Sequence, residues 1–216
     1  MARPRRPLLT RDRIIETALA LVDAEGLAAV STRRLATELG VQGPSLYNHV
    51  RTKDDLIDAV VDAVLGEVDI SMFDDLSARN PDWRSSLREW ARSYRTAMAA
   101  HPHIVPALAS GPGHRPNALR MADAVFGGLV AAGWPRREAT TVGTTMRYFL
   151  TGASLGSFAA GFPADATVYA DAYPHLNEAH LLAERQQRID RDAFEAGLEA
   201  LLDGLANRYR VVTADA

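Results

Sequence analysis

Residues 32–50 read TRRLATELGVQGPSLYNHV, and this stretch decides the fold of the first part of the chain. Leu35 and Leu39 lie four residues apart, a spacing that places both on the inner face of a short helix. Gly40 can supply the sharp turn that follows, because glycine adopts a left-handed backbone without steric cost. Leu46 and Val50 repeat the four-residue spacing in the next segment. The stretch therefore predicts two helices joined by a tight turn.

The second of these helices carries small or hydrogen-bonding side chains on its outer side and no carboxylate: Gln42, Gly43, Ser45, Tyr47, Asn48 and His49. A helix in the major groove of DNA needs donors and acceptors for base edges, and no negative charge beside the phosphates. Four cations flank the helix as candidate phosphate contacts, namely Arg33, Arg34, Arg51 and Lys53. An ordinary helical hairpin with a polar outer face is the alternative to a DNA-reading helix.

Helix signals continue in both directions from this stretch. Thr10 and Gly26 delimit a first helix, Ser31 can cap the second, and Thr52 can cap a fourth one. Beyond residue 70 the apolar spacing predicts longer helices at about 82–101, 103–109, 116–132, 136–160, 178–188 and 190–209, with a long loop at 161–177. We expect an all-α fold with a three-helix, helix-turn-helix DNA-binding domain at 1–52 and a helical ligand-binding and dimerisation domain at 53–216.

The composition excludes several classes of protein. The chain has no cysteine, which rules out disulfides, thiolate nucleophiles and cysteine zinc sites. No apolar run approaches the ~18 residues that span a bilayer, and residues 1–6 are not followed by the apolar stretch of a secretory signal. We therefore expect a cytoplasmic protein with no membrane partner.

Charge is distributed unevenly along the chain. Residues 1–53 hold nine Lys and Arg against five Asp and Glu, whereas the remainder holds fifteen against twenty-two. A basic N-terminal part on an acidic body favours a polyanionic partner for the first part only. The alternative is a chance imbalance between solvated surfaces.

The stretch RIIETALALVDAEGLAAVSTRRLATELGVQGPSLYNHVRTKDDLIDAV, residues 13–60, resembles the N-terminal domain of the TetR family of bacterial repressors. Within it, LGVQGPSLYNHVRTKDDL matches the family's turn, recognition helix and following helix almost position by position. The resemblance implies that Thr32 and Arg33 contact the DNA backbone or groove edge, and that Tyr47, His49 and Lys53 contact phosphates. It also implies that Gly43, Pro44, Ser45 and Asn48 face the bases. Gly43 departs from the longer polar residue of the tetracycline repressors and has no side chain to bind a base.

Residues 101–161, from HPHIVPALAS to GASLGSFAAG, are similar to the C-terminal domain of the tetracycline repressors. In that branch, helices near the C-terminus form a four-helix dimer bundle, and the other helices enclose an effector pocket. Two stripes fit a dimer bundle, the small residues Gly143, Gly152, Ala153, Gly156 and Ala159 and the apolar residues Phe194, Leu198, Leu201, Leu202 and Leu205. We expect a homodimer; the alternative is that both stripes form the internal core of a monomer.

Seven side chains are candidates for an effector pocket: Trp90, Tyr94, His103, Met121, Phe126, Met146 and Phe149. Aromatic and methionine residues at helical spacing fit a plain core equally well. Leu108 lies near the position of a magnesium-binding histidine in the tetracycline repressors, so the resemblance implies a ligand other than tetracycline. His101 and His103 lack a third ligand, and we expect no metal site and no cofactor. Arg147 is the one fixed charge near Met146, which favours an uncharged or singly anionic ligand.

These patterns together predict a DNA-binding transcriptional regulator, a repressor that a small molecule releases from a palindromic operator. An enzyme is the first rival, but no nucleophile–base pair, phosphate-binding glycine loop or metal cluster occurs at motif spacing. A helical adaptor that binds only proteins is the second rival, and the basic outer face at 33–53 speaks against it.

Overall fold

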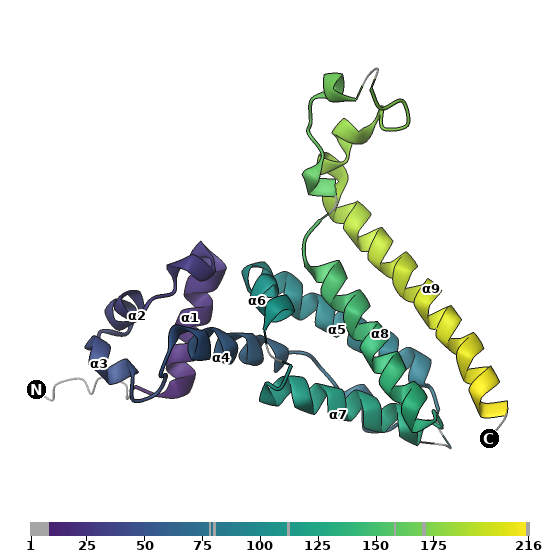
Figure 1. The fold of residues 1–216 in the computed structure, drawn as a ribbon, viewed down its shortest axis with the longest axis horizontal. Helices are drawn as coiled ribbons and strands as arrows, with labels where there is room; N and C mark the ends of the chain where they lie inside the picture. Colours follow the sequence, from purple (N-terminus) through teal and green to yellow (C-terminus); the bar gives the residue numbers. More distant parts are fainter. Residues whose placement is uncertain are drawn as a thin grey trace, which may run out of the picture.

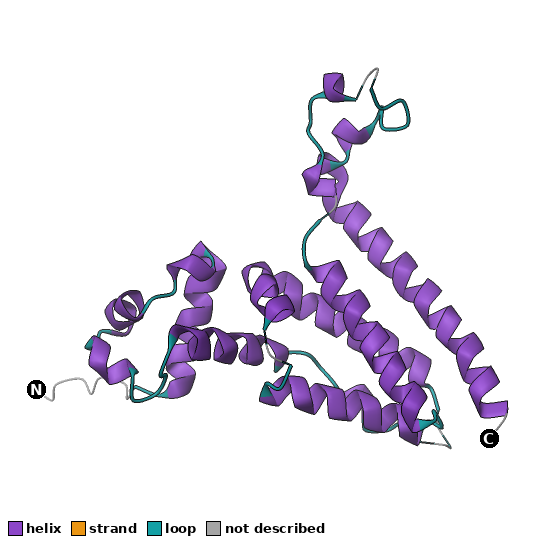
Figure 2. Cartoon of the chain, viewed as in Figure 1, coloured by secondary structure: helices purple, strands orange, loops and turns teal. Residues whose placement is uncertain are grey.

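The computed structural model describes residues 9–77, 79, 81–111, 113–157, 159–169 and 172–214. Nine α-helices and seven short 3₁₀ turns make up the regular structure of these residues, and none of them forms a β-strand (Figure 2). A small N-terminal head leads into a larger helical body, and a long helix closes the chain (Figure 1). The predicted all-α fold is confirmed.

The head consists of α1 (Arg11–Glu25), α2 (Thr32–Leu39) and α3 (Gly43–Leu46). Thr10 and Ser31 are the N-caps of α1 and α2, and each hydroxyl accepts a hydrogen bond from the amide three residues later at 3.2 Å. Gly26 and Gly40 end these helices with φ angles of 83° and 66°, which favour glycine. The caps that the sequence predicted are thus in place, and they fix where α1 and α2 begin and end.

Helix α4 (Lys53–Leu65) joins the head to the body. Its N-cap Thr52 accepts a hydrogen bond from the Asp55 amide at 3.0 Å. Six of its thirteen residues are buried. It packs against α1 in the head and against α5 (Trp83–Ala100), α6 (Val105–Ser110) and α7 (Pro116–Ala131) in the body. Because one helix contributes to both cores, the head cannot rotate on the body without disturbing α4.

The body is built on α5, α7 and α8 (Arg136–Ser154), and α8 packs against both α5 and α7. The turn between α7 and α8 passes through Gly133, whose φ of 97° suits glycine alone. Trp134 follows it, is 2% exposed, and packs with ring centroids 5.0 Å from both Trp83 and Tyr209. This aromatic cluster holds α5, the α7–α8 turn and the C-terminal helix together at one end of the body.

Helix α9 (Gln186–Ala214) is a single helix of 29 residues that packs against α5. Three arginines on α5 face three carboxylates on α9, and both sets are spaced by four residues: Arg84, Arg88 and Arg92 with Glu195, Glu199 and Asp203. Arg88 donates to Glu199 at 2.5 and 2.9 Å, and Arg92 donates to Glu195 at 2.7 and 3.2 Å. We call this set the ionic row.

The predicted helix boundaries need correction between residues 154 and 186. Helix α8 ends at Ser154 rather than near 160, because the chain turns at Gly156 with a φ of 144°. The predicted helix at 178–188 is wrong, since the backbone there closes short 3₁₀ turns at Ala179–Leu181 and Ala183–Arg185. The predicted helix at 190–209 is part of the longer α9. The described residues between 155 and 185 form a lobe beyond the ends of α8 and α9 (Figure 1).

Most of the stripes assigned to a dimer bundle lie inside the protomer. Phe194, Leu198 and Leu202 are buried in the core, and the Phe194 ring stacks on Phe149 with centroids 5.5 Å apart. A β-carbon at Gly143 would lie 3.7 Å from Val125 of α7, so this position faces the body. Gly156 and Ala159 lie beyond the end of α8. Spacing alone could not separate these positions from the exposed Gly152 and Ala153 and the half-buried Leu201 and Leu205.

The ionic row generates a prediction about acid stability. Hydrogen bonds from Arg88 and Arg84 lower the pKa of the Glu199 carboxyl from 4.5 to about 2. Because the folded-state pKa is depressed, Glu199 stabilises the fold above pH 4.5, and this contribution is lost as the pH falls toward 2. Glu199→Gln should lower the urea midpoint of unfolding near neutral pH, and the difference from wild type should vanish toward pH 2.

Glu16→Gln, at an exposed position on α1, is the matched control and should leave the urea midpoint unchanged. A difference between wild type and Glu199→Gln that stays constant throughout the acid range would contradict the role given to the ionic row.

Candidate DNA interface and ligand cavity

The turn between α2 and α3 has the geometry that the sequence predicted. Gly40 adopts the left-handed conformation with φ 66° and ψ 33°. The Val41 amide then donates to the Ala36 carbonyl at 3.0 Å and closes the end of α2. Pro44 lies in the first turn of α3, where its missing N–H costs nothing. Leu46 is buried and anchors α3 to the head.

The outer side of this second helix is open to solvent. Tyr47 is 57% exposed, Asn48 and His49 are exposed, and the described residues around Gly43 leave room for a β-carbon. Pro44 is exposed, and Ser45 is half-buried. The predicted helix at 44–50 is shorter than expected, because α3 ends at Leu46 and residues 47–49 form a turn. The side chains predicted to read bases therefore stand on one turn of helix and the turn that follows it.

The side chains predicted to contact phosphates differ in their exposure and in whether they already form ion pairs within the protein. Arg33 and Lys53 are exposed, and neither forms an ion pair with a described residue. Thr32 is half-buried at the start of α2. Arg34 instead pairs with Glu25 at 3.0 Å and with Glu38 at 3.1 Å. Arg33 and Lys53 are thus the better placed of these cations to meet DNA.

Two histidines at the end of α5 link the body to the head rather than line a pocket. His101 Nδ1 lies 2.9 Å from Asp23 of α1, and Nε2 lies 3.2 Å from Glu67. Burial lowers the pKa of His101, but the two carboxylates outweigh it and leave the pKa raised. His103 Nδ1 lies 3.0 Å from the Val22 carbonyl of α1. The prediction that His103 lines the effector pocket is therefore wrong, because its ring is turned toward α1.

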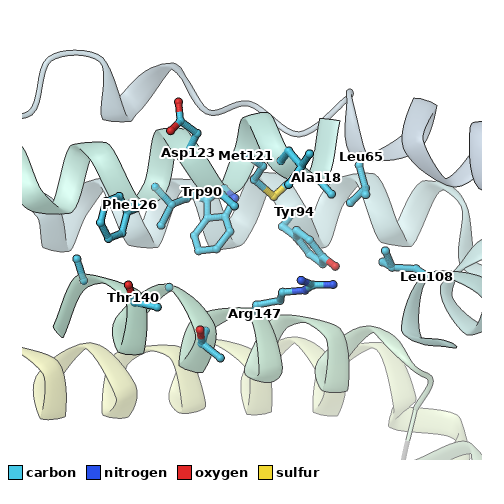
Figure 3. Close-up of a pocket in the computed structure, with 16 residues that line it drawn as sticks. Leu65, Trp90, Tyr94, Leu108, Ala118, Met121, Asp123, Phe126, Thr140 and Arg147 are labelled. Atoms are coloured by element: carbon cyan, nitrogen blue, oxygen red, sulfur yellow. The ribbon is translucent and has the colours of Figure 1, made fainter. Parts of the chain in front are cut away.

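A cavity of about 460 Å³ lies between α5, α7 and α8 (Figure 3). This volume is typical of small-molecule sites. Four of the predicted pocket residues line it, namely Trp90, Tyr94, Met121 and Phe126. Met146 and Phe149 do not, because Met146 is buried in the core and Phe149 stacks on Phe194 of α9. The apolar spacing identified the right helices but could not distinguish the cavity side of α8 from its core side.

Several lining residues were not among the seven predicted pocket residues, although Arg147 was expected nearby. One face of α8 contributes small or polar side chains at helical spacing: Thr140, Gly143, Thr144 and Arg147. Leu65 comes from α4, and Leu108 comes from α6. The spacing of 140, 143, 144 and 147 was the available signal, because small residues on an inward face leave space that large apolar residues would fill.

The cavity is tied directly to α4. Besides Leu65 in its lining, the Asn117 amide and side chain at the start of α7 both bind Asp62 of α4, each at 2.8 Å. The buried Arg115 donates to Asp58 of α4 at 2.7 Å. A shift of α7 would therefore reach α4 through hydrogen bonds as well as through packing.

No group of three or more His, Cys, Asp or Glu side chains gathers as a metal site among the described residues. Within the same residues, no helix is long and apolar enough to cross a membrane.

Two family models match the chain. Residues 14–60 match the model of bacterial regulatory proteins of the tetR family, and residues 76–209 match that of the tetracyclin repressor-like C-terminal domain. The first range covers the head and the start of α4, and the second covers the helices that surround the cavity.

Similar proteins agree with both matches. The chain is 36% identical to the Escherichia coli tetracycline repressor protein class A from transposon 1721, over 92% of this chain and 91% of that protein. It is 34% identical to an HTH-type transcriptional regulator of Saccharopolyspora erythraea, over 68% of this chain but only 60% of that protein. The solved structure of the Streptomyces coelicolor TetR family protein ActR in complex with actinorhodin superposes with a TM-score of 0.73 at 30% identity, over 94% and 99% of the two chains. The chain therefore belongs to the TetR family of bacterial DNA-binding transcriptional regulators.

Proposed function

We propose that this regulator is a homodimeric repressor that leaves a palindromic operator when a small molecule occupies the cavity between α5, α7 and α8. It acts in the cytoplasm, where its DNA is, and it performs no catalysis and needs no cofactor. The division into a DNA-binding domain at 1–52 and an effector-binding and dimerisation domain at 53–216 is part of this proposal.

The observation that carries the proposal is the position of α4. One end of this helix packs in the head, and its last residue, Leu65, lines the cavity. Asp62 and Asp58 bind the start of α7 and the segment before it. A ligand between α7 and α8 thus contacts the element that orients the DNA-reading surface.

The dimer makes a small tilt of α4 decisive. Two recognition helices of a dimer must stand about 34–36 Å apart to enter successive major grooves on one face of the duplex. A tilt that spreads the heads by a few ångströms breaks this match in both half-sites. Only a ligand that prefers the spread form shifts the equilibrium, and a ~100-fold loss of operator affinity requires about 2.7 kcal/mol of coupling.

The DNA contacts divide into positioning and reading. We assign Thr32, Arg33, Tyr47, His49 and Lys53 to the DNA backbone, and Gly43, Pro44, Ser45 and Asn48 to the base edges. Exposure supports this division, because Asn48 is the one exposed side chain of the second set that carries both a hydrogen-bond donor and an acceptor. Gly43 leaves room at the protein–DNA interface that a longer side chain would fill.

Similar proteins give a general guide to the chemical class of the effector. Similar proteins include tetracycline repressors and ActR, whose structure was solved in complex with actinorhodin. Leu108, which lies near the position of the magnesium-binding histidine of the tetracycline repressors, lines the cavity here. We therefore propose an apolar or amphipathic effector other than tetracycline.

The first prediction about the proposed function concerns how side chains of the head contact DNA. Lys53→Ala should weaken binding to all DNA sequences alike and reduce the salt dependence by about one phosphate's share. Asn48→Ala should instead relax the preference at one base pair per half-site, costing on the order of 1–3 kcal/mol. The measurement is operator affinity across a library of single-base variants at several salt concentrations. An unchanged preference profile for Asn48→Ala would remove Asn48 from the base-reading set.

The second prediction concerns the dimer. Tyr148 on α8 is 73% exposed in the isolated chain, an unusual position for a large aromatic side chain. If α8 meets a partner, Tyr148→Asp buries an unpaired charge and should shift the protein to monomer in light scattering. Thr96→Asp, at an exposed position on α5, serves as control and should stay dimeric. A Tyr148→Asp protein that remains fully dimeric would place the interface elsewhere.

The third prediction tests the cavity as the effector site. Gly143→Phe should fill the cavity from α8, because the nearest atom to a β-carbon there is 3.7 Å away and the side chain continues into open space. The variant should bind operator normally but no longer release it with molecules that release wild type, found by a thermal-shift screen. Gly127→Phe on α7, outside the cavity lining, is the matched control. Normal release from Gly143→Phe would show that the effector binds elsewhere.

A further inference from the structure

The cavity contains a fixed cation that no described residue neutralises. Arg147 extends from α8 into the space between the helices, and Figure 3 shows its guanidinium beside the ring of Tyr94. No ion pair joins Arg147 to another described residue. Arg147 is exposed to solvent at the cavity wall. An arginine cannot lose its charge in a protein, so this part of the wall is positively charged at all physiological pH values.

The surrounding groups leave that charge in place. Asp123 is the only carboxylate in the lining, and Figure 3 shows it on α7 with its oxygens turned away from Arg147. Burial raises the pKa of the Tyr94 hydroxyl, so Tyr94 remains neutral and offers a hydrogen bond rather than a counter-charge. Arg136 does not line the cavity, but it lies 5.0 Å from the centre of the ring of Phe126, which does.

A second polar group in the lining has no partner. Trp90 is 3% exposed, and its Nε1 finds no hydrogen-bond partner among the described residues. Figure 3 shows this nitrogen on the side of the ring that faces Met121 and Tyr94. A buried donor without a partner is costly, and a ligand acceptor would remove that cost. Met121 is flexible enough to move aside for such an acceptor.

Apart from Thr140 and Thr144 on α8, the rest of the lining is apolar or aromatic and favours a ligand with planar rings. Leu65, Val125 and Phe126 face the space together with the Trp90 indole. Gly143 has no side chain, so the surface of α8 leaves space opposite Val125 of α7. Planar fused rings can stack on the aromatic side chains of the lining, and they bind with less loss of conformational freedom than a branched or flexible chain.

We propose that the effector is a planar aromatic mono-anion of two to four fused rings, with its anionic group on Arg147 and a carbonyl or hydroxyl oxygen on Trp90 Nε1. This inference rests on the proposed function of the cavity and adds its chemical specificity. Arg147 selects for the negative charge, because a carboxylate can accept two parallel hydrogen bonds from one guanidinium. Trp90 selects for the acceptor on the ring system, and a cationic analogue is repelled.

The test compares matched probes on naphthalene, fluorenone and anthraquinone frames, each carrying a carboxylate, a carboxamide or an aminomethyl group. Binding to the full-length protein is measured by calorimetry without DNA. On the best frame, wild type should prefer the carboxylate to the carboxamide by at least about tenfold and should reject the amine. Arg147→Met keeps the aliphatic stem and should abolish this preference. Arg137→Met, an exposed position on the same helix outside the cavity, should retain it.

Trp90→Phe separates the second contact from the first. It removes the N–H while keeping an aromatic ring, so it should weaken the fluorenone and anthraquinone carboxylates more than the naphthalene carboxylate, which has no ring carbonyl. Equal weakening of all three frames would overturn the assignment of Trp90 as a donor to the ligand.

Operator release by the same probes distinguishes this inference from the function it rests on. Carboxylates that bind through Arg147 without releasing operator would uphold the ligand class and contradict the effector role of the cavity. Neutral or cationic probes that bind best and release operator would uphold the effector role and overturn the proposed mono-anion. Failure of every carboxylate to bind would overturn it as well.

Discussion

Helix α4 must satisfy two hydrophobic cores at once, and the rest of the structure depends on this constraint. Its buried residues, Leu56, Ala59, Val60, Val61, Val64 and Leu65, are shared between α1 of the head and α5, α6 and α7 of the body. A helix with only one apolar stripe would leave either the head or the body unanchored. Because interiors are close-packed, a displacement of one neighbour of α4 is transmitted to the others rather than absorbed.

Hydrogen bonds between the head, α4 and the rest of the body add to this packing. Around α4 the body reaches the head through His101 with Asp23 and through His103 with the Val22 carbonyl. On the other side, Arg115 and Asn117 bind carboxylates of α4. Hydrogen bonds tolerate less sliding than apolar contacts, since they weaken steeply with distance and angle. Head, α4 and α7 therefore form a linked set on which a ligand between α7 and α8 can act.

The cavity itself results from small residues where large ones would pack. Thr140, Gly143 and Thr144 are small residues on the face of α8 that lines the cavity. Elsewhere, the aromatic cluster at Trp134 joins α5, the α7–α8 turn and α9, and the ionic row joins α5 to α9. The cavity thus stays open, because the helices around it are held in place by contacts away from the cavity. Arg147 then gives the opening a charge.

The sequence by itself determined the features that rest on local chemistry. Caps at Thr10, Ser31 and Thr52, the left-handed turn at Gly40 and the exposed side chains after Leu46 all follow from backbone and side-chain properties of a few adjacent residues. Trp90, Tyr94, Met121 and Phe126 were also found this way, because their helices were recognisable from spacing.

Only the tertiary structure decided which side of each helix meets which neighbour. Met146 and Arg147 are adjacent in sequence, yet one is core and the other lines the cavity. Phe194, Leu198 and Leu202 formed a stripe that fitted a second chain, but α5 and α8 of the same chain bury it. His103 was equally ambiguous until α1 was seen beside it. The physical reason is that apolar spacing fixes the face that avoids water, whereas the partner that covers this face depends on contacts between segments far apart in the chain.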